Sequence, residues 1–132
     1  MKIYILFIAT ICLFISCQET MEERCAREAK EYTKKNCPAK IYDNLVHDSI
    51  VFEKDTRSMC YYYTFTENVN INTKEKRDEI GRIFLDNLKN STSLKTYKDA
   101  GLNFKYTYYS SNGKKDIVFQ KTFTKQDYQS TK

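Results

Sequence analysis

The chain has 132 residues, a net charge of +5 and enough apolar residues for one domain with a buried core. It holds five cysteines, but His47 is its single histidine and no Cys-x-x-Cys pair occurs. These counts argue against a zinc site and against a dithiol redox motif. We therefore expect no metal and no cofactor.

The first sixteen residues have the layout of a secretory signal. Lys2 supplies a short positive start, the stretch 3–15 carries no charge, and Ser16 places a small residue directly before Cys17. The apolar stretch is shorter than the ~20 residues that a membrane-spanning helix needs. We expect cleavage before Cys17, while cleavage at an ordinary site and a retained membrane anchor stay open as alternatives.

The placement of Cys17 resembles a bacterial lipoprotein signal, in which the cysteine thiol receives lipid such as palmitate. With this cleavage we expect three parts: a lipoprotein signal peptide (1–16), a lipidated tether (17–19) and one α+β domain (20–132), whose elements are predicted below. The resemblance implies an exported protein held in the membrane by lipid on Cys17. Acidic residues that follow the cysteine are similar to the export signals of Bacteroidetes surface lipoproteins, so the outer membrane or cell surface is expected. These residues are Glu19, Glu22 and Glu23.

Positive charge is concentrated at the C-terminal end of the chain. Residues 95–132 carry 8 basic and 3 acidic side chains, whereas residues 17–94 carry 13 and 14. An exported protein meets no genome in its compartment, so we expect no nucleic-acid partner. Anionic lipid, a glycan or an acidic protein fits the charge better, and lysines that only keep a tyrosine-rich sheet soluble are the simplest alternative.

Three cysteines remain if Cys17 carries lipid: Cys25, Cys37 and Cys60. They allow at most one disulfide and leave one thiol over. We predict the pair Cys25–Cys60, because Cys25 falls on the apolar stripe of the first predicted helix and a helix packed across the sheet could bring it near Cys60.

The spacing predicts a first helix over residues 20–35. Thr20-x-x-Glu23 is a capping box, and apolar residues then recur at helical spacing. The helix should end before Cys37-Pro38, because the residue before proline is pushed out of the helical region.

Two strands are predicted next, over residues 46–54 and 59–67, with a turn at 55–58. In the second of them, Tyr61 and Tyr63 should share one face, and Cys60 and Tyr62 the other.

A second helix is predicted to begin at Asn72-x-x-Glu75, with Ile80, Ile83, Phe84 and Leu88 on one side. Residues 90–101 read as a polar connection. The C-terminal part alternates in hydrophobicity around Asn112-Gly113, which predicts a hairpin with these two residues at the centre of a type I′ turn.

These elements predict an α+β fold of two αββ units. Their hairpins should join into a four-stranded antiparallel sheet with both helices on one face. Ile83 and Ile117 are expected in the core between the helices and the sheet. The opposite face should then present Tyr62, Lys105 and Tyr109 as a binding surface, since exposed tyrosines are favoured anchors; half-buried cross-strand packing is the alternative.

A wider resemblance rests on segments spread over residues 37–128. They are Cys37-Pro38, His47-Asp48-Ser49-Ile50-Val51, Tyr61-Tyr62-Tyr63-Thr64, Ala100-Gly101-Leu102-Asn103-Phe104, Asn112-Gly113 and Asp127-Tyr128. Together they are similar to small uncharacterised bacterial, Bacteroidetes-like lipoproteins. The resemblance implies the αββαββ order and no particular activity.

Enzyme activity has weak support in the sequence. In a regular strand His47 and Ser49 would share a face and Asp48 would turn away, so these three cannot form a triad, and we expect His47 to face solvent. A thiol enzyme or hydrolase that uses Cys37 or Cys60 with His47 as base is the alternative.

The sequence therefore favours a lipid-anchored envelope protein that acts as a binding or interaction module, of an immunity or inhibitor type. An envelope protein or a glycan is the expected partner. A third interpretation is a purely structural envelope component without a discrete ligand.

Overall fold

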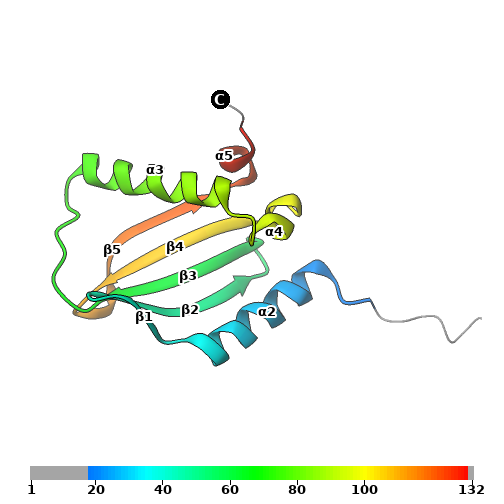
Figure 1. Cartoon of the computed structure of the whole chain (residues 1–132), viewed down its shortest axis with the longest axis horizontal. Helices are drawn as coiled ribbons and strands as arrows, with labels where there is room; N and C mark the ends of the chain where they lie inside the picture. The colour runs from blue at the N-terminus through cyan, green and yellow to red at the C-terminus, as the bar shows by residue number, and fades with distance from the viewer. Residues whose placement is uncertain (1–17, 131–132) are drawn as a thin grey trace, which may run out of the picture.

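A computed structural model describes residues 18–130 of the chain, apart from the side chains of residues 113–115 (Figure 1). The predicted signal peptide (1–16) and the predicted lipidation site Cys17 lie outside the described residues. None of the helices in residues 18–130 has the length and apolar character of a membrane span.

The first described helix, α2 (Met21–Asn36), confirms the helix predicted over residues 20–35. The side chain of Thr20 accepts a hydrogen bond from the Glu23 N–H, and the Glu23 carboxylate accepts one from the Thr20 N–H. This capping box satisfies backbone donors that a helix start leaves unpaired. The helix ends at Asn36, and Cys37 is already extended, as the proline that follows it requires.

The sheet has five strands rather than the four predicted, in the order β1-β2-β3-β4-β5. The strands are β1 (Ala39–Tyr42), β2 (Leu45–Glu53), β3 (Ser58–Phe65), β4 (Asn103–Ser110) and β5 (Gly113–Phe123). Strand β1 was not predicted, and with four residues it is too short to give a clear alternating pattern. It pairs only with the first residues of β2, from Leu45 to His47.

The sheet is mixed, not antiparallel as predicted, because β3 and β4 run parallel. Two helices, α3 (Lys74–Asn90) and the short α4 (Lys95–Asp99), carry the chain back along the sheet before β4 begins. Such a crossover returns the next strand in the same direction, whereas a hairpin would reverse it. The other three pairs of neighbouring strands are antiparallel.

Two predicted positions, the start of α3 and the loop of the last hairpin, are off by one residue. Helix α3 is capped by the hydroxyl of Thr73, which accepts from the Lys76 N–H, and not by Asn72. The C-terminal hairpin forms as predicted, but Ser110 pairs with Gly113, so its two loop residues are Ser111 and Asn112. A register irregularity beside Ser110 accounts for this shift.

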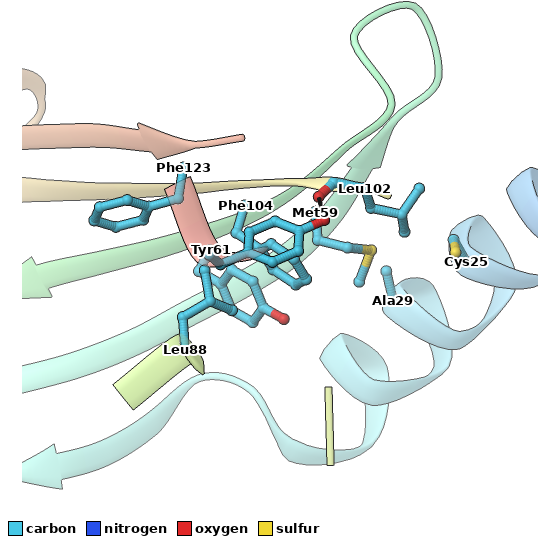
Figure 2. Packing of buried hydrophobic residues seen from close by; sticks show 9 residues of the cluster. Cys25, Ala29, Met59, Tyr61, Leu88, Leu102, Phe104 and Phe123 are labelled. Atoms are coloured by element: carbon cyan, nitrogen blue, oxygen red, sulfur yellow. Dashed lines mark hydrogen bonds between the residues drawn. The ribbon is translucent and has the colours of Figure 1, made fainter. Parts of the chain in front are cut away.

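The helices contribute to one core on one face of the sheet, as predicted. Helix α2 lies along β2, and α3 packs against β5 and the C-terminal helix α5 (Lys125–Gln129) (Figure 1). Residues of α2, α3 and α5 meet the inward side chains of β3, β4 and β5 (Figure 2). The buried cluster consists of Cys25, Ala29, Met59, Tyr61, Leu88, Leu102, Phe104, Phe123 and Tyr128.

Two residues predicted to lie in this core are exposed. Ile83 is 52% exposed because the part of α3 that faces the sheet is narrower than its apolar stripe. Ile117 is 51% exposed, since a register irregularity pairs it with Tyr109, which lies on the face away from the helices. We call that face the outer face; it carries Tyr62, Lys105, Thr107 and Tyr109.

Candidate functional site

The predicted binding residues Tyr62, Lys105 and Tyr109 lie together on the outer face. The rings of Tyr62 and Tyr109 stack with their centroids 6.2 Å apart and their planes at 9°. Lys105 Nζ lies 3.6 Å from a carboxylate oxygen of Glu53. The structure thus brings the three residues together, while their role in binding remains a prediction.

Polar side chains of the outer face mostly form hydrogen bonds with one another. The hydroxyl of Thr64 donates to the Asp48 carboxylate at 2.6 Å, and the amide of Gln120 donates to the Thr107 hydroxyl at 2.9 Å. Burial raises the pKa of Tyr62 to about 12, so this ring is neutral at physiological pH. The tyrosine stack is therefore an aromatic patch among paired polar groups.

A second surface, which we call the apolar groove, opens between α3 and the β1–β2 end of the sheet. It holds a cavity of about 260 Å³ whose lining is almost wholly apolar. Tyr42 on β1 is 68% exposed and Ile83 on α3 is 52% exposed, so both stand at its rim. The lining residues are Tyr42, Leu45, Phe65, Ile71, Ile80, Ile83, Phe84, Tyr108 and Phe119.

Sequence reasoning missed this groove for two reasons. It predicted no strand that contains Tyr42, and it assigned Ile83 to the core. The sequence feature that could have predicted the groove is the apolar stripe of α3. This stripe is wider than the contact between one helix and a sheet requires.

His47 is buried, not solvent-facing as predicted. A bulge between His47 and Ser49 puts Ser49 opposite Tyr62 on the outer face, while His47 pairs with Tyr63 on the core face. Its ring stacks on Tyr63 with centroids 4.7 Å apart. Within residues 18–130, its Nε2 atom has no hydrogen-bond partner.

Cys37 is the thiol that approaches this histidine, with 3.9 Å between Sγ and Nδ1. Burial lowers the pKa of His47, and burial together with the charge of Asp48 raises the pKa of the Cys37 thiol. Both shifts favour the uncharged pair, whereas a nucleophilic cysteine needs its thiolate. The arrangement is therefore suited to packing rather than to attack on a substrate.

Cys60 does not pair with His47 or with Cys25. It is buried on the outer face, opposite Lys105 in the register, whereas His47 and Cys25 lie on the core side. Its thiol donates to the Ser58 carbonyl at 3.7 Å, and burial raises its pKa to about 11. The predicted Cys25–Cys60 disulfide is absent because the sheet separates the two residues, and Cys25, Cys37 and Cys60 are all free thiols.

Among residues 18–130, no cluster of three or more histidine, cysteine, aspartate or glutamate side chains could hold a metal ion.

The model of one protein family, described as Domain of unknown function (DUF8479), matches residues 20–119. The chain belongs to the DUF8479 family. The match spans most of the chain and covers α2 through the middle of β5. No curated protein matches the sequence significantly.

Solved structures share the fold of this DUF8479 domain at low sequence identity. A candidate secreted protein of Pseudomonas aeruginosa, PA3611, superposes with a TM-score of 0.62 and 10% identity, over 85% of this chain and 100% of that one. The pilotin EpsS of the Vibrio vulnificus type 2 secretion system gives 0.62 and 14%, over 83% and 93%. The type II secretion system pilotin AspS of Vibrio cholerae gives 0.56 and 9%, over 80% and 90%.

These identities establish a shared fold and nothing finer. A Bacteroidetes origin and a lipid anchor stay predictions from the sequence.

Proposed function

We propose that this DUF8479 chain is an exported cell-envelope protein that binds a partner protein through its apolar groove. The signal-like segment 1–16 supports export. The fold agrees with this, because the similar structures include a candidate secreted protein and two pilotins of secretion systems. Inhibitor and immunity functions are finer forms of the same proposal.

The observation that carries the proposal is the open apolar cavity with Tyr42 and Ile83 exposed at its rim. Its volume of about 260 Å³ is below the about 300–1,000 Å³ that is typical of small-molecule sites. A cavity of this size accommodates an apolar anchor side chain from a protein, the usual centre of a binding hot spot. The outer face, with the Tyr62–Tyr109 stack, is a second candidate surface for such binding.

The enzyme alternative has less support. Cys37 is the cysteine that lies near His47, and the pKa shifts of both groups oppose the charged pair that thiol catalysis uses. A binding function needs neither group.

Site-specific photo-crosslinking in the native envelope tests the proposal. A photoreactive residue replaces Ile83 in one variant and Tyr32 in a matched control, which is an exposed apolar position on the other long helix. We expect a crosslinked protein from position 83 and none from position 32.

The captured protein is then purified and its affinity measured directly. Ile83→Asp should weaken binding at least about tenfold, because a charge at the rim of the groove must be desolvated on binding. Tyr32→Asp should leave the affinity unchanged. Equal crosslinking at both positions, or an unchanged affinity for Ile83→Asp, would contradict the proposal.

A further inference from the structure

Strand β5 is an open edge of the sheet along its whole length of 11 residues. Among the described residues, its only strand neighbour is β4. Over residues 116–123, no backbone group on the free edge is bonded to another described residue. Such an edge offers a row of N–H and C=O groups that an additional strand can pair with.

A trough lies between this edge and helix α3. Its main cavity, of about 620 Å³, has one wall from α3 and the other from β5. A second cavity, of about 400 Å³, continues it toward the Ser110–Asn112 end of the hairpin, because the two cavities share Arg77, Ile117 and Val118. The trough therefore follows β5 over most of its length.

Gly81 of α3 leaves space in the wall of this trough. The residue is buried, yet a Cβ atom at this position would have no neighbouring atom within 4 Å. Glycine is unfavourable in the middle of a helix, so the α3 helix alone gives no reason for it. In the trough, the missing side chain lets another backbone approach α3 closely.

The charged side chains that line the trough indicate which kind of segment it would bind. Arg77, Arg82 and Lys121 line it and take part in no ion pair among the described residues. Its three carboxylates are those of Asp78 and Asp127 in the main cavity and of Asp116 in the second cavity, and the one on Asp127 accepts the N–H and hydroxyl of Thr124. In the main cavity the three cations outnumber the two carboxylates, which favours acidic side chains opposite them.

A second copy of the chain suits this edge less well. Strand β5 contains three lysines and one aspartate, so antiparallel pairing of two copies would place like charges near one another. Lysines on an edge strand are a common protection against such pairing.

We propose that β5 and α3 form a second docking site, which binds an extended acidic segment of a partner protein as a sixth strand beside β5. Main-chain hydrogen bonds to β5 would supply affinity, and the trough and its cations would supply selectivity. This site is separate from the apolar groove, which lies on the other side of α3.

Peptide selection tests the proposal. A phage-displayed library of random decapeptides is first depleted on the Gly81→Leu variant and then selected on the detergent-purified full chain. Leucine at position 81 fills the trough, while its better helix propensity should leave the melting temperature unchanged or higher. We expect the selected peptides to be rich in aspartate and glutamate.

Two measurements on the best synthetic peptide follow. Its binding should slow hydrogen exchange of backbone amides in β5, and N-methylation of the alternate peptide residues that face β5 should weaken it at least tenfold. Methylation of the other alternate residues should have little effect. Arg82→Glu should weaken binding, whereas Ile83→Asp should not, which separates this site from the apolar groove.

The proposal is overturned if no selected peptide distinguishes the full chain from Gly81→Leu, if the peptides lack acidic residues, or if protection appears outside β5. A concentration-dependent dimer in which β5 amides are protected would assign the edge to a second copy instead.

Discussion

The hydroxyl of Thr33 both donates to the carbonyl of Ile50, at 2.9 Å, and accepts from its N–H, at 2.8 Å. Ile50 lies on the part of β2 that β1 does not reach. One side chain of α2 therefore takes the place of a missing neighbouring strand at this point of the edge. It also fixes the position of α2 beside the sheet.

Thr33→Val should destabilise the domain by about 1–3 kcal/mol, because it leaves a partly buried N–H and carbonyl without partners while it conserves the shape of the side chain. Urea unfolding followed by circular dichroism measures this change. Thr33→Ser keeps the hydroxyl and should cost clearly less. Equal losses in the two variants would show that the hydroxyl is not what matters.

His47 should make stability depend on pH. Because burial lowers its pKa in the folded state, the unfolded chain binds a proton more readily. Stability is therefore unaffected by this group above pH about 6.5 and falls as the pH drops below the unfolded pKa.

His47→Phe should remove this dependence, since His47 is the only histidine of the chain. The aromatic ring can still stack on Tyr63, and the unpartnered Nε2 is gone. Melting curves at pH 7.5 and 5.5 measure the effect. A pH profile that is the same in the variant and the unchanged protein would contradict the assignment.

The tyrosine stack of the outer face should show measurable coupling. A double-mutant cycle of Tyr62→Ala and Tyr109→Ala should give a coupling free energy of about 0.5–1.5 kcal/mol, the range for stacked aromatic pairs. Chemical unfolding of the four proteins provides the values. If the coupling is near zero and partner binding is lost, the two rings serve binding and not packing.

Lipidation of Cys17 remains to be tested directly. Cys17→Ser should give a product that no longer partitions into the detergent phase, or a precursor that is not cleaved, because lipid attachment needs the thiol. Phase partitioning and intact mass of the exported protein measure this. Unchanged partitioning of the variant would reject the lipoprotein interpretation.

Short sequence patterns predicted the parts of the fold that depend on residues close to one another in the sequence. Thr20 and Glu23 predicted the start of α2, and the alternation around Asn112 predicted the last hairpin. The direction of β4 was not predictable in this way, because it depends on the path of α3 and α4. The burial of His47 depends on a single bulge, which moves a side chain to the other face of the sheet.

The candidate sites were harder to predict than the fold. The outer-face tyrosines followed from strand alternation, but the apolar groove depends on where α3 crosses the sheet. The trough beside β5 depends in addition on Gly81, which by sequence alone is only a weak point in a helix.

The parallel pairing of β3 with β4 has a consequence for how the domain assembles. The described residues up to β3, 18–65, form one helix with three locally connected strands, and the described residues from α3 onward form a second local unit. Contacts within each unit close short loops, whereas the β3–β4 pairing closes a long one and has the larger entropy cost. A chain cut in the segment 66–72 should therefore give two fragments that meet along this strand pair and across the shared core, so the domain is a natural scaffold for a split-protein reporter.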